Sequence, residues 1–331
     1  MNAISGRGLT WSVLVSLGSL KLTLGLLPVL GAAVLVTYAS ESHIAWWLAI
    51  PLAVCACNLL AAIVTNGAFR RQLPLLVFHV ALLALILLLA AGRLTYLKGK
   101  AEVVEGGVFE GDLADVDSGP WHMFRLDSVK FVNDGFSIDY APGVRRGATR
   151  NTLRYYDDDG TPRQAVIGDN QPLVVHGYRF YTSFNKGFAP IFRWHSKDAP
   201  ETAIGAVHLP AFPLHEYEQA KEWTLPGTGM PIWVMLQFSE KIIDPEKADQ
   251  FKIPGNHTVV LRVGDKRWEL RPGQSAELPG GRIEYDSLRT WMGYNVFYDW
   301  TLSWLLAACL TAVGALATHF WVKLSAKPWN A

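Results

Sequence analysis

Four long apolar runs constrain the fold of this 331-residue chain more than any other feature of its sequence. A bilayer core of about 30 Å is crossed by roughly 20 helical residues. Runs of about that length occupy residues 20–38, 44–64, 73–94 and 300–322, whereas residues 95–299 are too polar to span. The sequence therefore predicts a membrane protein with four transmembrane α-helices and one large domain inserted between the third and the fourth.

Charges in the short loops predict the orientation of these helices. Arg70 and Arg71 lie between the second and third runs, whereas the loop between the first and second runs has neither Lys nor Arg. The positive-inside rule assigns the arginine loop to the cytoplasm, so residues 1–19 and 323–331 are also expected there. Residues 95–299 then lie in the periplasm of a bacterium, and the chain is a multi-pass protein of the inner membrane. The first run lacks a cleavage pattern and is expected to be a retained anchor.

Composition excludes several classes of function. The net charge is +1 without a long basic run, so nothing indicates a nucleic-acid partner. The three cysteines, Cys55, Cys57 and Cys309, all fall inside predicted spans, which leaves the inserted domain without a disulfide. The chain has no C-x-x-C-H motif, so it is not expected to carry a covalently attached c-type haem of its own.

The inserted domain is predicted to be rich in β-strands. Short alternating segments separated by turn residues begin near residue 102. The pattern of strands or hairpins is found at 124–132, 151–167, 172–184, 233–243, 257–273 and 281–288, with turns at 157–160 and 263–266. Residues 208–223 are less regular and are expected to contain one short helix. The histidines of the domain show no metal-ligand spacing, and no catalytic motif of the G-x-S-x-G or H-E-x-x-H type is present.

His79 is the one titratable side chain within residues 73–92 of the third run, and ionisable residues inside membrane spans are functional by default. It lies about six residues into the span, or roughly 9 Å along the helix axis at 1.5 Å per residue. Neutral imidazole is a good ligand for iron, and haem is an apolar disc that a lipid-facing groove can accept. The residues alone leave two alternatives open, a haem ligand and a histidine that hydrogen-bonds another helix.

Several segments together resemble one family, the ResB (CcsB) component of the system II cytochrome c synthase. These segments are SLGSLKLTL at 16–24, the Phe-His pair at 78–79, LDSVKF at 126–131, DGFSIDY at 134–140, and NQPLVVHGYRFYTSF at 170–184 followed by GFAP. The resemblance covers most of the chain. The chain departs from the family just before the last run, where a DPG-like sequence is usual and Asp299-Trp300-Thr301 keeps only the acid.

The resemblance implies a cytochrome c biogenesis subunit that holds haem b at His79. With a CcsA-type partner, the subunit would deliver this haem for covalent attachment to apocytochrome c. The second axial ligand is expected on CcsA, and His319 in the fourth run, at nearly the depth of His79, is the internal alternative. No independent catalytic site is visible, which favours a synthase subunit over a self-sufficient enzyme. The other functions considered are a haem b electron-transfer subunit and a haem-free assembly scaffold.

Overall fold

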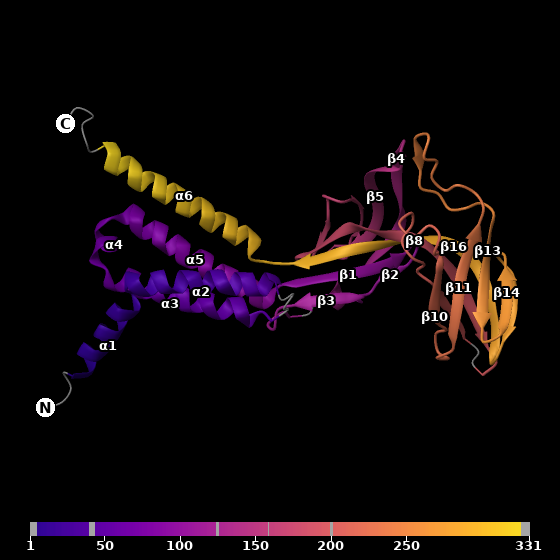
Figure 1. Ribbon diagram of the computed structural model, residues 1–331, viewed down its shortest axis with the longest axis horizontal. Coiled ribbons are helices and arrows are strands. Elements are labelled where there is room, and N and C mark those ends of the chain that lie inside the picture. Colours follow the sequence, from indigo (N-terminus) through magenta and orange to yellow (C-terminus); the bar gives the residue numbers. More distant parts are fainter. Residues whose placement is uncertain (1–4, 40–43, 124–125, 158, 199–200, 326–331) are drawn as a thin grey trace. The chain divides into compact units, whose positions relative to one another are not determined.

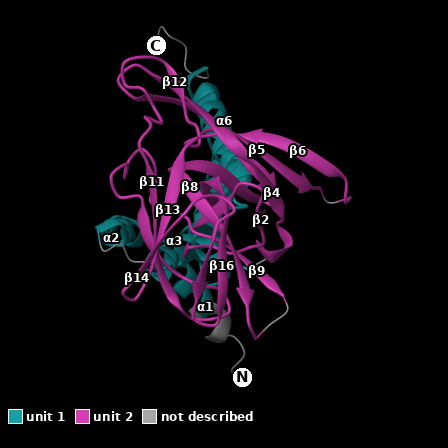
Figure 2. Cartoon of the chain, turned by 90° about the vertical axis from the view of Figure 1, so that its right-hand side faces the viewer, with its two compact units in different colours: residues 1–98, 117–123, 298–331 teal, residues 99–116, 124–297 magenta. Residues whose placement is uncertain are grey.

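A computed structural model of the chain describes residues 5–39, 44–123, 126–157, 159–198 and 201–325 (Figure 1). The chain divides into two compact units, shown in different colours in Figure 2. One unit is helical and comprises residues within 1–98, 117–123 and 298–331, and the other is built of β-strands from 99–116 and 124–297. The predicted fold class, four apolar helices with a β-rich domain between the third and the fourth, is confirmed.

Among its described residues, the helical unit contains four helices that are long and apolar enough to cross a membrane. They are α2 (Leu20–Ala39), α3 (Trp46–Thr65), α5 (Leu73–Thr95) and α6 (Leu302–Ser325). Two shorter helices, α1 (Ser5–Leu17) and α4 (Gly67–Arg71), precede α2 and α5. The segment expected to be a cytoplasmic N-terminal tail is therefore largely helical among its described residues.

Small side chains mark the contacts between the long helices. Helix α3 packs against α2 and α5, and α5 packs against α6. The buried residues on these surfaces are mostly alanines, including Ala61 of α3, Ala81 and Ala90 of α5, and Ala312 and Ala315 of α6. Small residues let helix backbones approach closely in lipid, where apolar burial alone gives little driving force between helices.

In the part of the β unit that the structure describes, the strands form three sheets. The first has the order β3-β1-β16-β8-β7, with β15 on β16 and β9 on β8; the second is β10-β11-β13-β14; the third is β12-β4-β5-β6, with β2 on β4. Their bounds are β1 (Leu97–Val104), β2 (Val108–Phe109), β3 (Asp115–Ser118), β4 (Phe131–Ala141), β5 (Arg145–Tyr156), β6 (Pro162–Ile167), β7 (Leu173–Val175), β8 (Tyr178–Ser196), β9 (Thr202–Ala206), β10 (Ala220–Thr224), β11 (Pro231–Phe238), β12 (Asp249–Gln250), β13 (His257–Val263), β14 (Lys266–Leu270), β15 (Ser275–Leu278) and β16 (Gly281–Tyr298), and a short 3-10 turn spans Leu126–Ser128.

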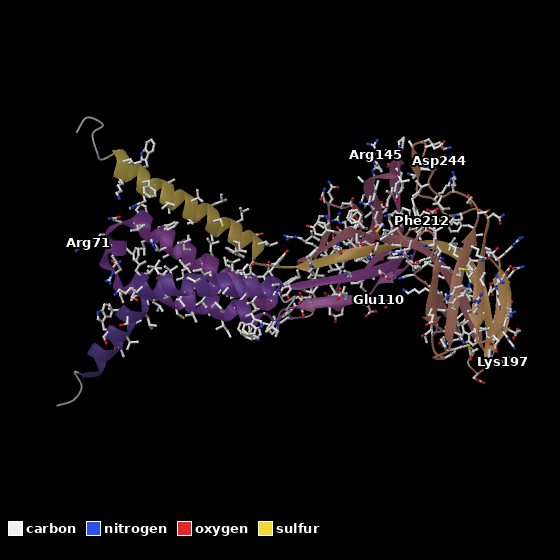
Figure 3. The ribbon with its side chains drawn as sticks, viewed as in Figure 1. Arg71, Glu110, Arg145, Lys197, Phe212 and Asp244 are labelled. Atoms are coloured by element: carbon white, nitrogen blue, oxygen red, sulfur yellow. The ribbon has the colours of Figure 1, made fainter. Side chains whose placement is uncertain are left out.

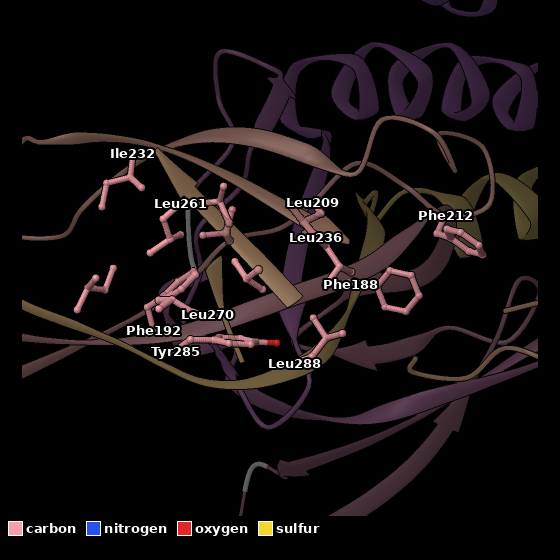
Figure 4. Close-up of a cluster of buried hydrophobic side chains, with 14 of the residues drawn as sticks. Phe188, Phe192, Leu209, Phe212, Ile232, Leu236, Leu261, Leu270, Tyr285 and Leu288 are labelled. Atoms are coloured by element: carbon pink, nitrogen blue, oxygen red, sulfur yellow. The ribbon is translucent and has the colours of Figure 1, made fainter. Parts of the chain in front are cut away.

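Alternating burial along the strands creates the core of the β unit. In β1 every second side chain is buried, as expected for a strand with one covered face. A large cluster lies among β8, β11, β13 and β16 and includes Phe188, Phe192, Leu236, Leu261 and Tyr285 (Figure 4). This cluster supplies the core that a domain of this size needs in the absence of disulfides.

The hairpins predicted with turns at 157–160 and 263–266 are confirmed, and residues 172–184 form a third. Strands β5 and β6, β7 and β8, and β13 and β14 pair antiparallel within the segments 151–167, 172–184 and 257–273. The β7–β8 turn is made by His176 and Gly177, which both have positive φ. The prediction of a short helix within residues 208–223 is wrong, because this segment consists of turns followed by β10. Buried Leu209 and Phe212 hold it against the core instead.

Candidate functional site

His79 lies in the first half of α5, next to the short helix α4. The side chain of Asn66 accepts a hydrogen bond from the Ala68 N–H at 3.0 Å, which caps α4, and a proline follows at the start of α5. This break directs Phe69 of α4 towards the imidazole, with ring centroids 4.3 Å apart, and Phe78 meets it at 5.1 Å. The two aromatic rings hold His79 half-buried.

The hydrogen bond of His79 defines which ring nitrogen is available. Nδ1 lies 2.8 Å from the carbonyl oxygen of Leu75, one helical turn earlier. A carbonyl only accepts, so Nδ1 carries the proton in the neutral ring and Nε2 keeps its lone pair. Within the described part of the chain no hydrogen-bond partner faces Nε2. This is the arrangement of a metal-ligating histidine whose second nitrogen is held by a backbone carbonyl.

A cavity of about 800 Å³ lies where α5 begins and α6 ends. Its lining combines apolar residues of both helices with His319 and two cations, Arg71 and Lys323. Figure 3 labels Arg71 at this end of the helical unit. We call it the arginine-side cavity. It is large enough for a cofactor, since pockets for small molecules measure about 300 to 1,000 Å³.

The two histidines named from the sequence occupy different positions around this cavity. His319 lines it, whereas His79 is not part of the lining and adjoins it through Leu75, whose carbonyl oxygen bonds the imidazole. Sequence reasoning used Arg71 and Lys323 only as signals of orientation and missed their shared cavity. The sequence did contain a signal for it, because Arg71 just precedes the third predicted span and Lys323 just follows the fourth, so both are expected on the same side of the membrane.

The histidines of the β unit have structural partners. His208 stacks on Trp291 and hydrogen-bonds the Glu102 carboxylate at 3.0 Å, and this bond lowers the pKa of Glu102. His257 lies between the Pro254 carbonyl oxygen and the Tyr285 hydroxyl. Among the described residues, no group of three or more His, Cys, Asp or Glu side chains is placed to hold a metal ion.

Comparison with known proteins bears on the segment that contains His79. Residues 62–210 match the model of the ResB-like family. The resemblance to ResB is confirmed. No curated protein matches the chain. The ResB-like segment runs from the end of α3 through α5 and on to the turns that follow β9, and it leaves α6 and His319 outside.

The most specific motif of the ResB-like segment has a structural explanation. NQPLVVHGYRFYTSF and GFAP form β7 and β8, whose Phe180 and Phe188 are fully buried. A Cβ at Gly187 would lie 3.1 Å from both the Pro210 carbonyl oxygen and Trp291 Nε1, which is closer than an ordinary van der Waals contact and favours glycine there. The residues of this motif are therefore explained by the packing of β8, whereas the Phe-His pair contains an imidazole that packing alone does not require.

Proposed function

We propose that this chain is the haem-binding membrane subunit of a system II cytochrome c synthase. The ResB-like family suggests a role in cytochrome c biogenesis. In our proposal the subunit lies in the bacterial inner membrane with the β unit in the periplasm, holds haem b at His79, and passes it to apocytochrome c together with a CcsA-type partner. The partner carries out most of the attachment chemistry.

The observation that carries this proposal is the hydrogen bonding of the His79 ring. Its Nδ1–H donates to the Leu75 carbonyl oxygen, which leaves the Nε2 lone pair available and fixes the ring plane. A histidine that served only to join helices would direct a ring nitrogen to a neighbouring helix. Here the hydrogen bond of the His79 ring remains within α5.

The arginine-side cavity fits the remaining parts of a haem. Its apolar wall suits the macrocycle, and Arg71 and Lys323 are the cations that would pair with two carboxylates. Haem, when bound, supplies the iron and the vinyl groups that become thioethers. The chain itself contributes the imidazole ligand, the cations that orient the disc, and helices that exclude water.

A second candidate function follows from His319. Because His319 lines the same cavity, it is a source for the second axial ligand within the chain. A bis-histidine site of His79 and His319 would suit a haem b electron-transfer subunit rather than a delivery subunit. The two proposals differ in whether haem is permanent or is handed to the partner.

Exchange of the ligand tests the proposal. In His79→Gly we expect haem content and cytochrome c maturation to fall, and added imidazole to restore part of both by occupying the vacant iron position. Val80→Gly is the matched control, because it imposes the same helix cost of about 1 kcal/mol without removing a ligand. Haem is measured by the absorbance of purified chain, with and without the CcsA partner.

The same change at His319 separates the candidates. Equal loss at both positions would indicate the internal bis-histidine site, whereas loss at His79 alone would indicate a ligand on the partner. Normal haem content in His79→Gly would refute the assignment and leave the haem-free scaffold.

A further inference from the structure

A second cavity, of about 450 Å³, lies at the opposite ends of α5 and α6, where the chain passes into the β unit. We call it the insert-side cavity. Leucine and valine side chains of α2, α3, α5 and α6 form most of its wall. Its two charged residues are Arg93 and Asp299. Nothing in the haem proposal uses this cavity.

Among the described residues, no carboxylate forms an ion pair with Arg93. Its Cζ lies 4.6 Å from the centroid of the Tyr96 ring, and its Nε is enclosed without a hydrogen-bond acceptor among the described residues. Burial, together with a 2.5 Å hydrogen bond to Asp117, raises the pKa of Tyr96 to about 12. Tyr96 therefore stays neutral at physiological pH and cannot supply the negative charge that Arg93 lacks.

Asp299 lines the same cavity but forms no ion pair with Arg93. Its Oδ1 accepts the Thr301 N–H at 2.9 Å and the Thr301 hydroxyl at 2.6 Å, and no described residue bonds Oδ2. Gly92 makes room for this turn, since a Cβ there would lie 2.9 Å from Thr301 Oγ1 and 3.6 Å from Asp299 Oδ1. One cavity thus holds a cation and an anion that do not neutralise each other.

The depth of the cavity matches that of lipid headgroups. Arg93 is two residues from the end of α5. The same end of the helical unit carries Trp46, which meets Trp121 edge-on at 5.6 Å, and Trp300, whose Nε1 donates to Thr95 Oγ1 at 2.9 Å. Tryptophans concentrate at membrane interfaces, so the charges lie at headgroup level and the apolar wall lies towards the acyl chains.

We propose that the insert-side cavity binds a zwitterionic phospholipid with a primary ammonium headgroup. Its phosphate lies at Arg93, its ammonium at Asp299 Oδ2, and one acyl chain along the leucines of α2, α3 and α5. Half-buried charges are costly unless paired, and this headgroup pairs both at once. An anionic lipid would pair with Arg93 but would be repelled by the Asp299 carboxylate. A quaternary ammonium headgroup has no N–H and cannot donate a hydrogen bond to Asp299.

Lipid retention by the purified full chain tests this site. The chain is incubated in detergent with phosphatidylethanolamine, phosphatidylglycerol or phosphatidylcholine of the same acyl chains, and bound lipid is counted by native mass spectrometry without haem. We expect preferential retention of phosphatidylethanolamine, reduced about tenfold in Arg93→Gln, which corresponds to about 1.4 kcal/mol, because the variant loses the charge-assisted hydrogen bond to the phosphate. Asp299→Asn keeps Oδ1 as an acceptor for Thr301, so the turn persists while the ammonium partner is lost.

The control is Arg70→Gln, which removes an exposed guanidinium that lines neither cavity and donates to the Val64 carbonyl oxygen. Equal retention of the three lipids, or equal behaviour of Arg93→Gln and Arg70→Gln, would overturn the proposal. Preference for phosphatidylglycerol that survives Asp299→Asn would identify an anionic lipid instead. Displacement of lipid by haemin would identify haem as the occupant. Because the lipid arms contain no haem, their failure leaves the role of His79 untouched.

Discussion

At the scale of single residues, Lys186 shows how the β unit tolerates a buried charge. Its side chain is 2% exposed, and Nζ reaches the Phe184 carbonyl oxygen at 3.4 Å. Burial, reinforced by the nearby Arg146 guanidinium, lowers the pKa of Lys186 to about 8, although Asp169 opposes this shift. Asp169 already accepts a hydrogen bond from Arg146 at 2.8 Å, so two cations share one carboxylate. Removing the charge of Lys186 should therefore favour the folded state.

This charge predicts a pH dependence of stability. The pKa of Lys186 falls from 10.5 to about 8 on folding, so between these values the unfolded chain binds more protons and stability rises with pH. In Lys186→Met we expect this rise to disappear and the unfolding temperature at pH 7 to increase. Thermal unfolding of the full chain in detergent, followed by tryptophan fluorescence, measures both effects. Lys197→Met, which removes an exposed charge, is the control, and parallel pH profiles for Lys186→Met and wild type would contradict the prediction.

At the scale of elements, regular patterns could be predicted and contacts between distant segments could not. Hydropathy predicted α2, α3, α5 and α6 to within a few residues, and alternation with turn residues predicted the hairpin of β13 and β14. The break between α1 and α2 was missed, because it depends on α3. A Cβ at Gly18 would lie 2.7 Å from the Ala62 backbone nitrogen, and Asn58 bonds the Leu17 carbonyl oxygen at 2.5 Å.

Asn58 therefore has a testable role in joining these helices. It is 4% exposed, and besides bonding Leu17 it accepts the Thr23 hydroxyl at 2.8 Å through Oδ1. We expect Asn58→Ala to lower the free energy of unfolding of the helical unit by about 0.6 to 2 kcal/mol, the range for hydrogen bonds between membrane helices. A double-mutant cycle with Thr23→Val, by unfolding in mixed micelles, isolates the side-chain pair. Thr37→Ala, which removes only a bond within α2, should cost less, and zero coupling between Asn58 and Thr23 would contradict the assignment.

At the scale of the whole molecule, the sequence draws attention to one side chain, His79, but not to its surroundings. His79 stands out because a titratable residue is conspicuous in an apolar run, and its role as a ligand stays a prediction. The arginine-side cavity could not be predicted, since Arg71 and His319 are far apart in the sequence and meet only because α5 and α6 pack together. The insert-side cavity was missed for the same reason, with Arg93 at the end of one helix and Asp299 just before the start of another.

The orientation of the whole chain in the membrane decides in which leaflet each cavity lies. Arg70 and Arg71 end α4, and Lys323 lies in the last turn of α6, so these basic residues share one end of the helical unit. Because cytoplasmic loops are enriched in Lys and Arg, we expect a reporter inserted after Arg71 to be active only inside the cell. One inserted after Gly160, at the tip of the β5–β6 hairpin, should be active only in the periplasm. Alkaline phosphatase and a fluorescent protein, which function on opposite sides of the membrane, provide matched readouts at each site. Cytoplasmic activity of the reporter at Gly160 would contradict this orientation. His79 would then lie on the periplasmic side, and the proposed lipid site at Arg93 on the cytoplasmic side.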